Sequence, residues 1–302
     1  MKLGKSNLVV PNIAVGCMRI NSIEPQKAEE FVQKAIELGA NFFDHADIYG
    51  GGECEKIFSE AVHMSPAVRE NIILQSKCGI RSGMFDFSKE HILSSVDAIL
   101  KRLNTDYLDV LLLHRPDALV EPEEVAAAFD QLEQSGKVRH FGVSNQKPMQ
   151  IQLLQKFVQQ PIVANQLQLS ITNATMIGNG LEVNMLTDNA VDRDGSILDF
   201  CRLNDITIQP WSPFQYGFFE GVFLDNEKFP KLNQTINQIA QKYNVSNSTI
   251  AIAWILRHPA NMQPIIGTMN LERLQEICQA SEIYLSKEEW YQIYISAGNK
   301  LP

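Results

Sequence analysis

The chain has 302 residues, of which 45% are hydrophobic and 20% charged, and its formal net charge is −9 at neutral pH. This composition is typical of a folded globular protein and excludes collagen-like, mucin-like and disordered chains. The acidic balance argues against a general nucleic-acid-binding protein, which needs a basic surface, but it allows a small anionic ligand held by a few local cations.

Eight short apolar runs predict β-strands along the chain. The runs are continuous rather than alternating, which is typical of parallel strands buried on both faces. The predicted strands cover residues 13–17, 42–44, 72–77, 108–114, 138–144, 162–166, 206–211 and 264–267.

Amphipathic patterns between these runs predict helices. Ser22 is expected to cap a helix that ends at Gly39, Ser88 to cap the next clear one, and Pro122 to begin a third that ends at Gly136. Alternating strands and helices predict a parallel sheet. Eight such units indicate an α/β fold of the (β/α)8 TIM barrel type, formed by a single domain over residues 1–302, with a doubly wound sheet as the alternative.

The sequence gives no sign of a membrane span or a secretion signal. The apolar stretch 8–17 is interrupted by Pro11 and Asn12, and the charge-free stretch 157–181 contains several Asn and Gln side chains. The five cysteines are scattered without a C-x-x-C pair, which fits free thiols in a reducing compartment. We therefore expect a cytoplasmic protein with no metal site, no membrane partner and no nucleic-acid partner.

Polar residues stand at the carboxyl ends of six successive predicted strands. They are Asp44, Lys77, His114, Ser144 with Asn145, Asn165 with Gln166, and Trp211 with Ser212. Each has a structural alternative, such as a helix cap, a lysine that extends to solvent or a core histidine. In a barrel, however, all these strand ends meet at one mouth, where barrel enzymes have their active sites. The repeated pattern therefore predicts an active site there.

Four of the residues near this mouth suit the reduction of a carbonyl group. Tyr49 follows Asp44 in the loop that leaves the second strand, and a nearby Lys77 ammonium favours its phenolate form. Asp44 can hold Lys77 charged, and His114 can share the proton with the same substrate oxygen. Tyr49 would then supply a proton where negative charge develops, while the hydride must come from a cofactor. The sequence contains neither a G-x-G-x-x-G motif after a strand nor a P-loop motif, so it predicts neither a Rossmann nor a P-loop nucleotide site.

Several segments resemble motifs of the aldo-keto reductases. Residues 44–50 read Asp-His-Ala-Asp-Ile-Tyr-Gly, similar to the family's D-T-A-x-x-Y-G motif, and residues 136–145 match its G-K-x-R-x-x-G-x-S-N motif. The segments 73–77 and 107–114 resemble the strands that carry the family's Lys and His. Residues 165–166 and 211–213 correspond to its N-Q and [YW]-S-P segments. The resemblance covers nearly the whole chain in the same order.

This resemblance implies a barrel that binds NADP(H) and reduces small aldehydes or ketones to alcohols. It implies Tyr49 as the general acid, tuned by Lys77 and Asp44, with His114 orienting the carbonyl. The implied cofactor-binding residues are Ser144, Asn145 and Gln166 on the nicotinamide carboxamide, Trp211 and Ser212 at the ring, and Thr268, Asn270 and Arg273 at the adenosine phosphate.

Two departures from the family pattern stand out, and other functions stay open. His45 replaces the usual Thr after Asp44, and Gly267 stands where many members carry a Lys that meets the 2′-phosphate. The alternatives are a cofactor-binding redox sensor or regulatory subunit, like the β subunits of potassium channels, and a Schiff-base aldolase with Lys77 as the nucleophile. A metal site at Asp44, His45 and Asp47 is disfavoured, because neighbours on a strand face opposite ways.

Overall fold

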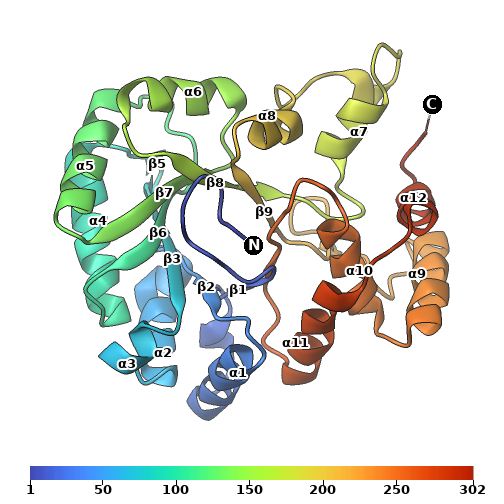
Figure 1. Cartoon of the computed structure of the whole chain (residues 1–302), viewed down its shortest axis with the longest axis horizontal. Helices are drawn as coiled ribbons and strands as arrows, with labels where there is room; N and C mark the ends of the chain where they lie inside the picture. The colour runs from blue at the N-terminus through green and yellow to red at the C-terminus, as the bar shows by residue number, and fades with distance from the viewer. Residues whose placement is uncertain (302) are drawn as a thin grey trace.

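Eight parallel strands form one sheet that curves into a nearly closed barrel (Figure 1). The computed structural model describes residues 1–301. The strand order is β12-β1-β2-β3-β6-β7-β8-β9. Between β9 and β12, the backbone N–H of Gln263 donates a hydrogen bond to the backbone carbonyl of Ile208 at 3.0 Å. The strands are β1 (Ala14–Gly16), β2 (Phe42–Asp44), β3 (Ile73–Cys78), β6 (Leu108–Leu113), β7 (Val138–Ser144), β8 (Ile162–Gln168), β9 (Thr207–Trp211) and β12 (Ile265–Ile266).

All eight predicted strands are present close to their predicted bounds, which confirms the barrel and excludes the doubly wound sheet. Helices cover the outside of the sheet, because the outward side chains of each strand are apolar and need a second layer. These helices are α1 (Pro25–Glu37), α2 (Glu53–Ala61), α3 (Pro66–Arg69), α4 (Lys89–Leu103), α5 (Pro122–Gln134), α6 (Pro148–Phe157), α7 (Thr175–Leu181), α8 (Ile197–Leu203), α9 (Pro230–Tyr243), α10 (Asn247–Leu256), α11 (Leu271–Cys278) and α12 (Lys287–Ser296).

Two of the three predicted helix starts are confirmed. The Ser88 side chain accepts from the His91 N–H at the start of α4, and Pro122 is the first residue of α5. The predicted Ser22 cap is wrong. Ser22 ends the 3-10 turn η1 (Ile20–Ser22), its hydroxyl donates to the Arg19 carbonyl, and α1 begins only at Pro25. The fixed φ angle of a proline at the first helical position sets this later start.

The two long intervals late in the chain contain additional elements rather than open loops. Residues 171–194 include α7 and the 3-10 turn η3 (Asp188–Ala190). Residues 214–231 carry a hairpin of β10 (Gln215–Tyr216) and β11 (Gly221–Val222), and a similar hairpin of β4 (Ile80–Arg81) and β5 (Met84–Phe85) follows β3. The 3-10 turns η2 (Tyr49–Gly52) and η4 (Gln279–Glu282) complete the elements. Both hairpins extend beyond the carboxyl ends of the strands.

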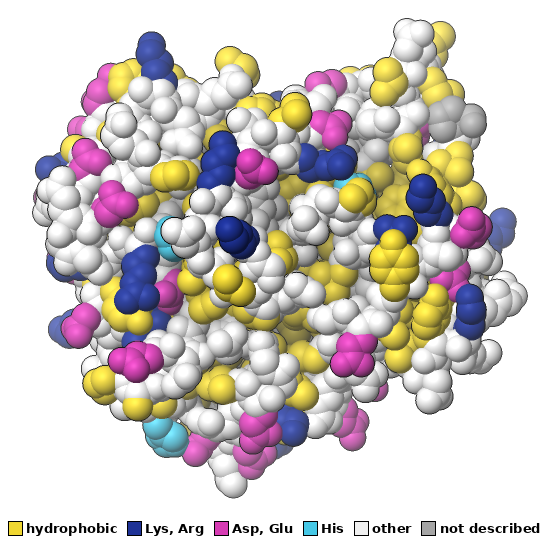
Figure 2. All heavy atoms as spheres, viewed as in Figure 1, with side chains coloured by type: hydrophobic (Ala, Val, Ile, Leu, Met, Phe, Trp, Pro, Cys, Tyr) yellow, Lys and Arg dark blue, Asp and Glu magenta, His cyan; other side chains and the backbone are white. Residues whose placement is uncertain are grey.

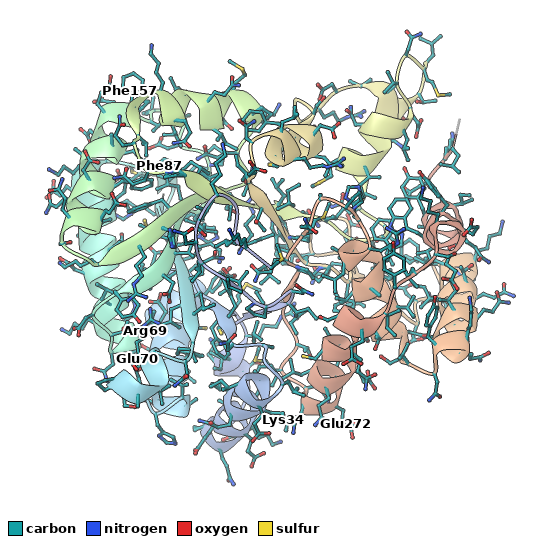
Figure 3. All side chains as sticks on the ribbon, in the orientation of Figure 1. Lys34, Arg69, Glu70, Phe87, Phe157 and Glu272 are labelled. Carbon is teal, nitrogen blue, oxygen red and sulfur yellow. The ribbon has the colours of Figure 1, made fainter. Side chains whose placement is uncertain are left out.

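The N-terminal segment lies across the amino end of the barrel (Figure 1). Lys2 and Val9 form an antiparallel bridge, and the buried Leu3 and Val10 pack with inward side chains of the strands such as Phe42 and Leu112. Side chains fill the centre of the barrel (Figure 3), so it is a packed core and not a pore. A ligand therefore has to enter from the opposite end of the strands.

The surface and the helices show two further features. On the face drawn in Figure 2, Lys and Arg side chains are scattered among Asp and Glu side chains and do not gather in one basic patch. Among residues 1–301, no helix combines the length and the hydropathy needed to cross a lipid bilayer.

Candidate active site

A buried ion pair lies at the carboxyl end of β2 and β3. The Lys77 Nζ donates to Asp44 Oδ2 at 2.8 Å, to the His45 carbonyl at 2.7 Å and to the Tyr49 hydroxyl at 3.2 Å. Lys77 is fully buried and Asp44 nearly so. These three contacts use all three protons of the ammonium, so the cation is fixed in position beside the phenol.

Burial and charge act in opposite directions on these groups. Burial is the largest single effect on Lys77 and lowers its pKa, but the charges and hydrogen bonds of Asp44 and Tyr49 together outweigh burial, so the pKa of Lys77 is raised. Burial raises the pKa of Tyr49, while the charge and the hydrogen bond of Lys77 act to lower it. We expected the ammonium to bring the pKa of Tyr49 down, and here burial is the larger effect. Tyr49 therefore keeps its proton at neutral pH, as a proton donor must.

Three consecutive glycines turn the chain from Tyr49 into α2. Gly50, Gly51 and Gly52 have φ angles of 58°, 66° and 93°, a left-handed conformation that other residues rarely adopt. A Cβ at Gly50 would lie 2.9 Å from the Asn21 side chain. The triplet is thus a tight turn that places Tyr49 at the barrel mouth.

His114 follows β6 and faces Tyr49. The two rings meet edge to face with their centroids 6.0 Å apart. Burial, with the charges of Lys77 and Arg115, holds the pKa of His114 well below its usual range. His114 is therefore a neutral hydrogen-bonding group, and its buried Nδ1 has no partner among the described residues.

A chain of buried amides supports Asp44 from inside the barrel. Gln75 Nε2 and Gln166 Nε2 donate to Asp44 Oδ1 at 2.6 and 3.1 Å. Gln75 also donates to Gln209, and Gln209 donates to Gln263, each at 2.9 Å. Sequence reasoning missed Gln75, Gln209 and Gln263, although a glutamine within an apolar strand is a signal that could have found them.

One cavity of about 590 Å³ opens at this mouth. It is lined by most of the predicted site residues, namely Asp44, Tyr49, His114, Ser144, Asn145, Gln166, Trp211, Ser212, Thr268 and Arg273. Lys77 lies buried behind this wall. Asn270 caps α11, where its Oδ1 accepts from the Arg273 N–H at 2.9 Å, so its role in the structure is to start the helix.

On one wall of the cavity, polar groups hold a tryptophan in place. Trp211 Nε1 donates to Asn145 Oδ1 at 3.2 Å, and Asn145 Nδ2 donates to Ser144 Oγ at 2.7 Å. Asn145 and Ser212 have φ angles of 56° and 53°, a strained conformation that often marks functional sites. The Trp211 ring stacks on Phe219 with centroids 5.9 Å apart. Ser144 and Asn145 do not cap α6, which begins at Pro148 after Lys147.

At the other end of the cavity, two arginines lie near Gly267. Arg19 and Arg273 both line it, and Arg19 Nη1 donates to the Gly267 carbonyl at 3.4 Å. Arg19 comes from the loop after β1, far away in sequence. Sequence reasoning missed it, and no motif around it signals this position.

His45 points away from the mouth. Its ring packs against Phe58 of α2 with centroids 4.6 Å apart, and burial lowers its pKa to about 3. Asp44 faces the barrel interior instead, and burial raises the pKa of the nearby Asp47 to about 7. Within residues 1–301, no group of three or more His, Cys, Asp or Glu side chains is arranged to hold a metal ion.

This fold and site define a class of barrel enzyme with a tyrosine, lysine, aspartate and histidine at one cavity. The family model described as "Aldo/keto reductase family" matches residues 12–296, and the chain belongs to this family. It is an oxidoreductase of the aldo-keto reductases, which use nicotinamide cofactors and act on small carbonyl compounds.

Relatives and solved structures agree with this assignment. The chain is 38% identical to the uncharacterized oxidoreductase YcsN of Bacillus subtilis, covering 95% of this chain and 94% of the relative. It is 31% identical to a 6-dehydroglucose reductase of Agrobacterium fabrum, covering 97% and 96%. The crystal structure of the thermostable aldo-keto reductase Tm1743 in complex with the inhibitor epalrestat is similar, with a TM-score of 0.79, 27% identity and 98% of both chains covered.

Proposed function

We propose that this protein is an NADP(H)-dependent reductase that converts aldehyde or ketone carbonyls to alcohols, with Tyr49 as the general acid. The observation that carries this proposal is the 3.2 Å contact between the Tyr49 hydroxyl and the fixed Lys77 ammonium at the base of the cavity. A proton donor, a cation and a neutral histidine there surround the place where a carbonyl oxygen would lie.

Each residue of the chain has a distinct task in this mechanism. When bound, the cofactor supplies the hydride, which no side chain can provide. Tyr49 donates its hydroxyl proton to the carbonyl oxygen as negative charge develops there. Lys77 stabilises the phenolate that remains, and Asp44 keeps Lys77 charged and aimed. His114 hydrogen-bonds the same oxygen and orients the carbonyl.

In this proposal the cavity holds the dinucleotide, with its phosphate at the end lined by Arg19 and Arg273. Trp211 offers a ring face near the catalytic residues, beside the amides of Asn145 and Gln166. Arg273 makes neither a side-chain hydrogen bond nor an ion pair within residues 1–301, and Arg19 contacts only the Gly267 carbonyl. We infer that Arg19 compensates for the lysine missing at Gly267, so that two guanidinium groups meet the 2′-phosphate.

The alternatives have less support. An aldolase needs a neutral Lys77, whereas the Asp44 charge raises the pKa of Lys77. A protein that only senses the redox state of a cofactor does not need the full group of Tyr49, Lys77, Asp44 and His114 to donate a proton. A cytoplasmic location is in keeping with the five cysteines, all of which are free thiols.

The test is the oxidation of NADPH by the purified protein with benzaldehyde, followed by absorbance, with NADH in a parallel assay. We expect aldehyde-dependent oxidation and a preference for NADPH. Tight NADPH binding without turnover on any of a panel of aldehydes and ketones would instead support the sensor, and a preference for NADH would overturn the cofactor proposal.

A further inference from the structure

Arg115 is a charged side chain of the cavity that the proposed mechanism does not use. It directly follows His114 at the end of β6, is half-buried and lines the cavity. Its guanidinium carbon lies 5.7 Å from the centroid of the Trp211 ring. Unlike Arg69 or Arg102, which have buried carboxylate partners, Arg115 makes no hydrogen bond and no ion pair within the described residues.

The other charges at this end of the cavity do not balance Arg115. Asp44 is already paired with Lys77 at 2.8 Å, and His114 is neutral. The other two carboxylates that line the cavity, Asp225 and Glu276, form no ion pair with Arg115 within residues 1–301. Arg115 is partly buried and has no anion in contact within residues 1–301, and burial lowers the pKa of its guanidinium. A partly desolvated cation of this kind gives the catalytic end a positive potential that attracts anions.

Apolar side chains also line the cavity that contains Arg115. Met18, Ile48, Ile80 and Phe219 line it and come from four segments that follow β1, β2, β3 and β9. Ile48 and Phe219 are 40% and 49% exposed, so part of each apolar side chain is accessible to a ligand. The catalytic end therefore combines an apolar surface with a single unpaired fork of N–H donors.

We propose that Arg115 binds a carboxylate of the substrate, so that the preferred substrates are aldehydes or ketones with an apolar body and an acidic group. This inference rests on the proposed reductase function and names its substrate class. A guanidinium binds a carboxylate with two parallel hydrogen bonds, which fixes orientation as well as position. The carbonyl would lie at Tyr49 and His114 while the carboxylate lies at Arg115.

The experiment compares two substrates of nearly equal shape, para-carboxybenzaldehyde and its neutral amide para-carbamoylbenzaldehyde. We expect wild-type kcat/KM to be at least about tenfold higher for the acid, as one charge-assisted hydrogen bond allows. Arg115→Met should abolish this preference while the amide is still reduced, and Arg115→Lys should restore only part of it, because lysine lacks the fork. Arg202→Met is the matched control, since Arg202 is exposed in α8 and does not line this cavity.

A binding measurement separates this inference from the proposed activity. Calorimetric titration of the NADP-loaded protein with benzoate and with benzamide should show benzoate binding at least about tenfold more tightly, and Arg115→Met should remove the difference. If neither aldehyde is reduced but benzoate binding depends on Arg115, the reductase proposal fails and the anion site stands. Equal kcat/KM for acid and amide in the wild type, or equal binding of benzoate and benzamide, would overturn the inference.

Discussion

Replacing Tyr49 by Phe removes one oxygen atom and leaves the ring in place. Among residues 1–301, the only hydrogen bond of this hydroxyl is the 3.2 Å contact with Lys77, and Lys77 keeps its bonds to Asp44 and to the His45 carbonyl when the hydroxyl is removed. Losing that contact should reduce the free energy of unfolding by about 1.5–3 kcal/mol, the range for a hydrogen bond to a charged group. The fold and the shape of the cavity should therefore persist.

The effect on catalysis should be larger than the effect on stability. A positioned general acid accelerates proton transfer by roughly 10²- to 10⁴-fold, which corresponds to about 3–5 kcal/mol of activation free energy. We expect Tyr49→Phe to lower kcat for aldehyde reduction by this factor and to change the NADPH dissociation constant less than about threefold. Stopped assays of NADPH oxidation, with fluorescence titration of the cofactor, measure both quantities on the same sample.

Two outcomes would refute this reasoning. If Tyr49→Phe retains kcat within about threefold of wild type, another group donates the proton. If cofactor affinity falls together with kcat, the expectation that the ring and the cavity keep their shape is wrong. Thermal unfolding of the variant serves as the control, because a folded protein is needed for either conclusion.

Three further predictions concern other parts of the site. Arg273→Ala should weaken the binding of NADPH at least about tenfold and the binding of NADH less than about threefold. Arg19→Ala should have the same effect to a smaller degree. Equal losses of affinity for both cofactors would contradict recognition of the 2′-phosphate. Trp211→Phe should abolish the fluorescence change on NADPH binding, and an unchanged signal would exclude stacking. In the folded protein the pKa of His45 is about 3, against 6.5 for a free histidine. Between these pH values His45 binds a proton in the unfolded chain but not in the folded protein, so the free energy of unfolding decreases as the pH falls from about 6.5 to 3. His45→Phe should reduce the slope of this decline by up to about 1.4 kcal/mol per pH unit in denaturant unfolding, and equal slopes would show that His45 does not cause it.

The sequence was sufficient to predict the barrel strands because their apolar runs are continuous. A strand such as Leu108–Leu113 contains one charged residue, Asp109, and is buried on both faces, so pattern and burial agree. The residues at the cavity were predictable for a related reason. Polar side chains such as Lys77 interrupt an apolar run at its carboxyl end, and the fold brings all such ends together.

Other features depend on contacts between distant segments. Arg19 is an exposed residue in a loop, and only the closure of the barrel between β1 and β12 brings it to Gly267. Ser22 was mispredicted because Ser22 and Pro25 are both start signals, and the choice between them depends on the packing of the η1 turn. The pKa of Tyr49 depends on how deeply the ring is buried, which no local pattern encodes.

Two buried ion pairs show how a structural role differs from a chemical one. Arg69, labelled in Figure 3, donates to Asp109 at 2.7 Å and otherwise to backbone carbonyls and a threonine, and neither residue lines the cavity. Lys77 is just as buried against Asp44, but its third partner is the Tyr49 hydroxyl. A buried ion pair often adds little net stability. In the proposed mechanism the Lys77 charge is present before and after Tyr49 gives up its proton, so the pair lowers the energy of the phenolate rather than that of the fold.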